Sequence, residues 1–222
     1  MTEAEWLACE DPEQMSLWIT ECGENRRKCR MLGCACARRL WHLLNDTYQT
    51  AVKVAEMYED DLADLRELEA AHREAEVASY RDFAGDTAVD LARIVVTHAA
   101  HPSDPFANLD KAVSAFAFDA ENAEVDWDEA RENELAVQVA LIHDIFGNPF
   151  RPVTLDPLWL TSDVQALAQG IYAERAFDRM PILADALQDA GCTSDDVLNH
   201  CRDANQVHVR GCWVLDLLLG KG

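Results

Sequence analysis

Apolar residues recur at spacings of three and four through most of the chain, and this periodicity limits the fold more than any other feature. Such spacing places side chains on one face of an α-helix. The clearest stripe consists of Val164, Leu167, Ala168, Ile171 and Tyr172. Strand-like alternation is confined to residues 206–209, which are few enough to form a loop. We therefore predict a mainly α protein, a compact, bundle-like orthogonal array of about eight to ten helices with little or no sheet.

Helix-boundary signals agree with this periodicity. Asp126 and Glu129 have the spacing of a capping box in front of a helix that we predict over residues 127–146. Thr193 or Ser194 is placed to cap a short helix further along the chain. The helices are therefore predicted from two independent signals, periodicity and capping.

The length of the chain, 222 residues, is compatible with one domain or with two closely packed lobes. Residues 147–158 hold three of the seven prolines and form the best internal boundary. We predict a single all-α domain over residues 1–222. The alternative is two lobes, an N-terminal helical lobe over residues 1–146 and a C-terminal loop and helical segment over residues 147–222.

The charge of the chain is strongly negative, with 41 acidic residues against 19 basic ones and a net charge of -22. Such a chain repels the phosphates of nucleic acids and anionic membrane surfaces, which argues against a nucleic-acid partner. Six of the basic residues lie in one predicted helix over residues 25–44, where we expect them to pair with neighbouring acidic helices. The remaining charge either favours a basic protein partner or serves solubility.

Neither end of the chain carries a targeting or membrane signal. The first residues lack a basic segment followed by an apolar one, and no stretch approaches the roughly 18 apolar residues that span a bilayer. We expect a cytoplasmic protein without a membrane segment. In that reducing compartment its eight cysteines should be free thiols.

Two of these cysteines, Cys34 and Cys36, fall inside the predicted helix over residues 25–44. Each helical residue turns by about 100°, so side chains two positions apart point about 200° away from each other. Both thiols therefore cannot hold one ion from a regular helix. We expect them to pack in the core as small apolar groups.

A second group of soft ligands lies near the C-terminus: Cys192, His200, Cys201, His208 and Cys212. Zinc takes thiolate and imidazole ligands in a tetrahedron. If the last helix begins near residue 208, His208 and Cys212 share one face and can chelate together. Zinc is the predicted cofactor, with the three cysteines and His208 as preferred ligands and His200 as the substitute. The alternatives are buried cysteines beside histidines bonded to helix ends, or a reactive Cys–His pair.

The loop over residues 146–152 supplies a candidate ligand site. Asn148 and Arg151 are polar side chains that could bind a ligand in a pocket beneath this aromatic, proline-rich loop. The alternative is that Asn148 is a turn residue and that Arg151 pairs with a surface acid.

Five segments carry a resemblance: residues 1–9, residues 34–42, IFGNPFRP at residues 145–152, residues 175–192, and HVRGCWVLDLLLG at residues 208–220. Together they resemble a family of uncharacterised bacterial proteins that has many paralogues within single genomes. The resemblance implies a bacterial cytoplasmic protein and supplies no catalytic residues, because the family has no established activity. A large paralogue set suits recognition or regulatory modules better than one housekeeping enzyme.

Familiar catalytic motifs are missing from the sequence. It has no Gly-rich phosphate loop, no Gly-x-Ser-x-Gly elbow and no His-Glu-x-x-His. We predict a non-enzymatic protein-interaction or regulatory module. The alternatives are a zinc-binding structural protein with a C-terminal Cys/His site, and an enzyme of unrecognised type.

Overall fold

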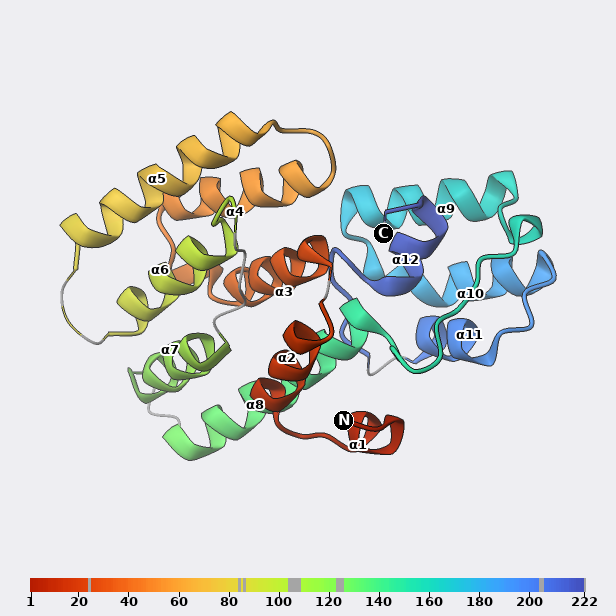
Figure 1. Cartoon of the computed structure of the whole chain (residues 1–222), viewed down its shortest axis with the longest axis horizontal. Helices are drawn as coiled ribbons and strands as arrows, with labels where there is room; N and C mark the ends of the chain where they lie inside the picture. Colours follow the sequence, from red (N-terminus) through yellow and green to blue (C-terminus); the bar gives the residue numbers. More distant parts are fainter. Residues whose placement is uncertain are drawn as a thin grey trace. The chain divides into compact units, whose positions relative to one another are not determined.

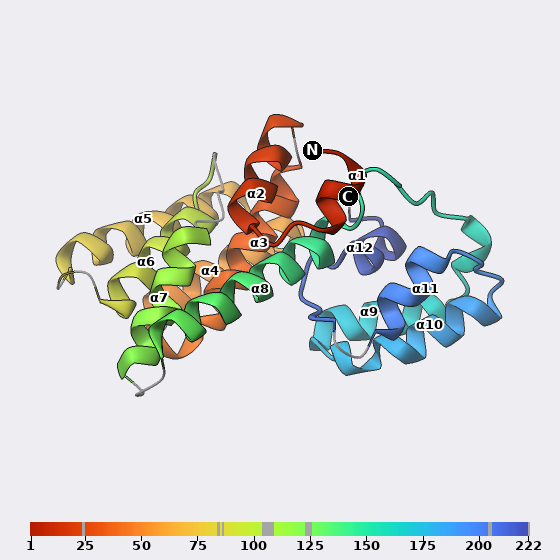
Figure 2. The same cartoon turned by 90° about the horizontal axis from the view of Figure 1, so that it is seen from below.

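The mainly α prediction is confirmed by the computed structural model, shown in two views in Figures 1 and 2. The structure describes residues 1–23, 25–83, 85, 87–103, 109–122, 126–203 and 206–221. Within these ranges it contains twelve α-helices and no strand, slightly more helices than the sequence predicts. None of the described helices is long and apolar enough to cross a membrane.

The chain divides into two compact units. Unit 1 comprises Met1–Leu7 and Ala140–Gly222, and unit 2 comprises Ala8–Val139. The division therefore falls inside helix α8 (Trp127–Phe146), whereas the sequence places its internal boundary after residue 146. The Asp126 carboxylate caps the start of this helix, accepting hydrogen bonds from the backbone N–H groups of residues 128 and 129.

Unit 2 is built around helix α3 (Arg26–Arg39), which packs against three other helices of the unit, α4, α6 and α7. Figure 1 shows α4 and α5 side by side. Helix α3 ends before residue 44, the predicted end, because a short 3₁₀ helix (Trp41–Leu43) follows it. The other helices of the unit are α2 (Pro12–Glu21), α4 (Asp46–Glu59), α5 (Leu65–Arg81), α6 (Ala88–Ala99) and α7 (Leu109–Asn122).

Helix α3 is buried on most of its surface, and most of its arginines pair with nearby carboxylates. Cys34 and Cys36 are both buried, as predicted for core residues, and burial raises the pKa of both thiols. The expected pairing of this helix with acidic neighbours is also confirmed. The ion pairs are Arg30 with Glu59 at 2.6 Å, Arg38 with Glu56 at 2.6 Å and Arg39 with Glu134 at 2.7 Å.

Unit 1 contains the short helix α1 (Glu3–Leu7), the end of α8 and four further helices. These are α9 (Ser162–Glu174), α10 (Met180–Asp189), α11 (Asp195–Arg202) and α12 (Trp213–Leu219). Helix α10 packs against α9 and α11, and α12 packs against the same two helices (Figure 2). Short 3₁₀ helices, Pro157–Trp159 and Phe177–Arg179, precede α9 and α10. Ser194, one of the two predicted caps, accepts a hydrogen bond from the Val197 N–H and begins α11.

Candidate metal centre

Four side chains of unit 1 converge into a group that could hold a metal ion. They are Asp144, His200, His208 and Cys212, and each offers one ligand atom. All four atoms lie within 4.8 Å of one another. The group joins the last turn of α8, the end of α11, and the segment that leads into α12.

A tight turn brings His208 and Cys212 together. The Cys212 N–H donates to the Val209 carbonyl over 3.1 Å, and Gly211 between them has a φ of 90°. A positive φ at the third position is what a type II turn requires, and glycine adopts it without strain. The Sγ of Cys212 lies 3.9 Å from Nδ1 of His208.

The predicted reason for the proximity of His208 and Cys212, a shared face of the last helix, is therefore wrong. Helix α12 begins at Trp213, so His208 and Cys212 do not share a helical face. A positive-φ glycine between them prevents the helix from starting earlier, and Cys212 instead takes the N-cap position. The turn over residues 209–212, and not a helix, brings the two side chains together.

The distances within the group match a compact coordination site. Nε2 of His200 lies 3.2 Å from Sγ of Cys212 and 3.2 Å from Oδ1 of Asp144. Nδ1 of His208 lies 2.8 Å from the same carboxylate oxygen. Tetrahedral zinc with bonds of about 2.0–2.3 Å holds its ligand atoms roughly 3.3–3.7 Å apart. The observed separations lie on both sides of that range, so small side-chain movements would complete the tetrahedron.

The Asp144 carboxylate is held in place by the backbone. Its side chain is completely buried, and Oδ2 accepts a hydrogen bond of 2.9 Å from the Val209 N–H. This bond leaves Oδ1 directed at the two imidazoles. In metal sites, hydrogen bonds of this kind orient the ligand and restrict it to one binding mode. Nε2 of His208 is buried and has no hydrogen-bond partner in the described part of the chain, so Nδ1 is the ring nitrogen that faces the group.

The electrostatics of the group favour a cation. Burial alone would raise the pKa of Asp144, but hydrogen bonds with His200 and His208 outweigh it and hold the pKa below its ordinary value. Burial, together with the charge of Asp144, holds the pKa of the Cys212 thiol well above its ordinary value. The carboxylate is therefore ionised, whereas the thiol keeps its proton until a metal ion displaces it.

The other two predicted ligands lie outside this group. Cys192 and Cys201 are both buried, at 2% and 1% exposure. The Cys192 N–H donates to the Leu187 carbonyl at the end of α10. Burial raises the pKa of the Cys201 thiol to about 12. The structure thus brings together three of the five predicted side chains, with His200 as a full member rather than a substitute.

Asp144 is the member of the group that the sequence analysis missed. It is the only acid in the apolar run LIHDIF at residues 141–146, where Leu141, Ile142 and Ile145 are completely buried. It also lies near the C-terminal end of α8, where the helix dipole disfavours an anion. An acid in such a position needs a compensating positive group. A lone acid in an apolar run at a helix end is therefore the sequence signal that could have identified Asp144.

The candidate ligand residues of the 146–152 loop make contacts within unit 1. The Nδ2 of Asn148 donates to Oε1 of Glu3 over 2.8 Å, and Arg151 forms an ion pair with the same oxygen. Asn148 also accepts a hydrogen bond from the Phe150 N–H, as a turn residue does. Asn148 is therefore a turn residue and Arg151 is paired with an acid, as the alternative prediction states.

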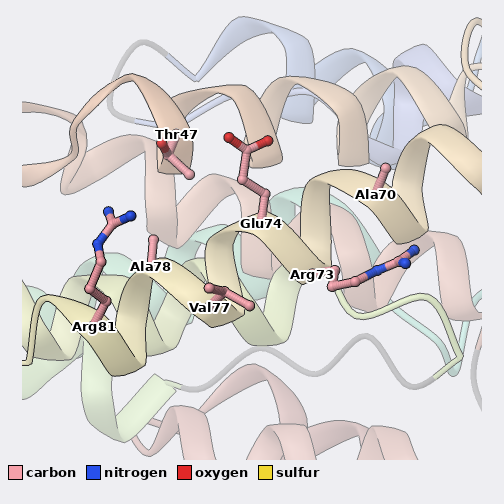
Figure 3. Close-up of a pocket in the computed structure, with 7 residues that line it drawn as sticks. All are labelled: Thr47, Ala70, Arg73, Glu74, Val77, Ala78 and Arg81. Atoms are coloured by element: carbon pink, nitrogen blue, oxygen red, sulfur yellow. The ribbon is translucent and has the colours of Figure 1, made fainter.

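A separate pocket of about 410 Å³ lies along α5 in unit 2. Figure 3 shows Arg73 and Arg81 extending in different directions along the helix, so their charges do not converge on one point. Arg81 is also paired with Asp82. A specific anion site needs positive groups that converge, and these two arginines do not. Its lining consists of Thr47 from α4 and, from α5, Ala70, Arg73, Glu74, Val77, Ala78 and Arg81.

Comparison with known proteins gives no match: no family model, no curated protein and no solved structure resembles the chain closely enough to be counted. The resemblance to a bacterial paralogue family therefore stays a prediction.

Proposed function

We propose that unit 1 binds one zinc ion through Asp144, His200, His208 and Cys212. The observation that supports this proposal is the convergence of four ligand atoms of three chemical kinds within 4.8 Å, in a buried part of the unit. We refer to these four side chains as the zinc site.

The ligand chemistry favours zinc over other divalent cations. A thiolate and two imidazoles are soft or borderline ligands, whereas magnesium and calcium select oxygen. Neutral imidazoles with one thiolate and one carboxylate also cancel the charge of a divalent ion. A complex without net charge suits this location, because the side chains of Asp144, His200 and His208 are only 0%, 10% and 6% exposed.

The proposed role of the ion is structural. Four protein ligands fill a zinc tetrahedron, whereas catalytic zinc keeps a position open for water or substrate. The ion would fasten the ends of α8 and α11 to the start of α12. The thiolate must stay reduced for this role, which agrees with the proposed cytoplasmic location.

Elemental analysis of the untagged protein tests the proposal. We expect about one zinc per chain in the parent protein and its loss in Cys212→Ser, because the hydroxyl is a poor zinc ligand. Cys201→Ser is the matched control, a buried cysteine in the same unit that lies outside the zinc site. Retention of zinc by Cys212→Ser, or its loss from Cys201→Ser, would contradict the assignment.

A second proposal, a regulatory module that binds a basic protein, draws support from the charge distribution. Three arginines of α3, namely Arg30, Arg38 and Arg39, are already paired with carboxylates of unit 2. The excess of acidic over basic residues therefore lies in other parts of the chain, where it could attract a basic partner. A partner that co-purifies with the protein from cell lysate should bind the purified protein directly, with an affinity that falls as the salt concentration rises. Salt-independent binding would contradict this proposal.

A further inference from the structure

The indole of Trp213 lies against one of the proposed zinc ligands. Its ring centroid is 5.2 Å from that of His200, with an angle of 54° between the ring planes. Trp213 is the first residue of α12 and directly follows the ligand Cys212.

The position of this indole is fixed by Gly147 at the end of α8. A Cβ added to Gly147 would lie 3.1 to 3.3 Å from three atoms of the indole, so the bare glycine backbone is already close to the ring. Gly147 is itself anchored, because its N–H donates to the His143 carbonyl and its own carbonyl accepts from Nε1 of Trp6. The indole therefore rests on the same helix end that carries Asp144.

The imidazole of His200 is contacted on two sides by rings. The indole of Trp213 makes one of these contacts. The ring of His208 makes the other, an edge-on contact with a centroid distance of 4.9 Å and an angle of 74°. In this orientation Nε2 of His200 points at Cys212 and Asp144, 3.2 Å from each ligand atom. A histidine without such contacts would sample other rotamers and lose entropy when it binds the metal.

We propose that Trp213 is a positioning residue that holds His200 ready for the zinc ion. This inference rests on the proposed zinc site. Gly147 supports the indole, and the indole supports the imidazole. The contact between Trp213 and His200 thus links the N-terminal end of α12 to the geometry of a ligand on α11.

The test compares Trp213→Leu with Trp213→Phe by chelator competition for zinc. The leucine variant should bind zinc about tenfold more weakly, as expected when a residue that orients a ligand is lost, and phenylalanine should restore most of the affinity. Trp159→Leu is the matched control, a buried tryptophan of the same unit. It should keep the parent affinity even if the protein is less stable.

Cobalt substitution adds a readout that a purely structural role would not change. Tetrahedral cobalt absorbs strongly in the visible range, so a loosened His200 should reduce that absorption in Trp213→Leu and leave Trp159→Leu unchanged. If the leucine variant does not fold, Gly147→Ala perturbs the same contact, because the new methyl group requires the indole to shift by a few tenths of an ångström, and the positive φ of residue 147 strains the alanine backbone as well. We expect weaker zinc binding in that variant too.

The outcomes separate the two proposals. Parent protein that binds neither zinc nor cobalt would overturn the zinc site and this inference together. Parent protein that binds zinc, with Cys212→Ser losing it and both Trp213→Leu and Gly147→Ala keeping the parent affinity, would overturn the role of Trp213 alone.

Discussion

Asp144 occupies a position in which a lone carboxylate is unfavourable. It is completely buried and lies near the end of α8, where the helix dipole is negative. The imidazoles of His200 and His208 and the N–H of Val209 compensate its charge. In the proposed site a zinc ion would provide stronger compensation.

Replacing Asp144 by asparagine should therefore remove zinc binding. The amide can still accept the Val209 hydrogen bond, but it is neutral and a poor zinc ligand, so we expect a loss of affinity of more than about 100-fold. Chelator competition measures the change. Asp163→Asn, at an exposed position of α9, is the control and should bind zinc as the parent does. Equal affinities in the two variants would remove Asp144 from the site.

His72 in unit 2 gives a prediction about pH. Burial and the nearby His101 lower its pKa below the ordinary value, although its Nδ1 contacts the Thr97 carbonyl. The unfolded chain therefore binds the proton more readily, and this residue's contribution to stability is lost as pH falls through about 6.5 and below. We expect His72→Gln to lose less stability than the parent between neutral and mildly acidic pH in urea unfolding. Parallel curves would contradict the assignment.

Cysteine placement shows where single-residue reasoning succeeds. Helical geometry alone excludes Cys34 and Cys36 as joint ligands, and both are core residues. The choice among the C-terminal thiols needed more than spacing. Cys212 belongs to the candidate metal group because a turn directs it there, while Cys201 is next to His200 in sequence and lies outside the group. Adjacent helical residues point about 100° apart, so the side chain of Cys201 does not point into the group that His200 joins.

At the level of elements, α3 depends on buried ion pairs. The Arg30 side chain is 2% exposed, pairs with Glu59 and donates to the carbonyls of Ala99, His101 and Pro102. A guanidinium suits this arrangement because its donors form a fixed fork, which lysine lacks. Losing it would leave a carboxylate and three carbonyl groups without this partner.

Arg30→Met should therefore destabilise the protein by about 3–5 kcal/mol, the usual cost of breaking a buried pair. Arg30→Lys should recover only part of that loss. The control is Arg81→Met, which breaks the exposed pair with Asp82 and should cost less than about 1 kcal/mol. Chemical denaturation measures all three variants. Equal effects at the two arginines would show that α3 does not depend on this pair.

The sequence predicts where helices occur better than where some of them begin. Periodicity identifies the helix over residues 127–146, and the Asp126 cap places its first residue correctly. The starts of other elements depend on backbone conformation. Helix α12 begins only at Trp213 because Gly211 has a positive φ, which the apolar pattern does not reveal. The candidate metal group lies at such helix ends, which explains why its members were predicted only in part.

At the scale of the molecule, the division into units depends on contacts that are distant in sequence. Residues 1–7 belong to unit 1 because Trp6 contacts the Gly147 carbonyl and the His143 ring. Local composition cannot indicate a contact across so much of the chain. A proline-rich segment marks a boundary in the sequence, but these residues lie within unit 1.

Zinc removal should affect the two units differently. A ligand that binds only the folded state stabilises it by an amount that grows with its concentration, about 2.7 kcal/mol at 100 times the dissociation constant. Chelation should therefore increase hydrogen exchange in α11 and α12 of unit 1, while the amides of α3 and α4 keep their protection. Hydrogen-exchange mass spectrometry with and without chelator measures this difference. Equal increases in both units, or none in either, would contradict a zinc site confined to unit 1.

X-ray absorption at the zinc edge tests the central claim most directly. The zinc-loaded protein should show one sulfur ligand at about 2.3 Å and three nitrogen or oxygen ligands at about 2.0–2.2 Å. Cys212→Ser should abolish the sulfur contribution, whereas Cys201→Ser should leave it unchanged. A first shell with two or more sulfur ligands would contradict the account, because it would bring Cys192 or Cys201 into the site in place of Asp144 or a histidine.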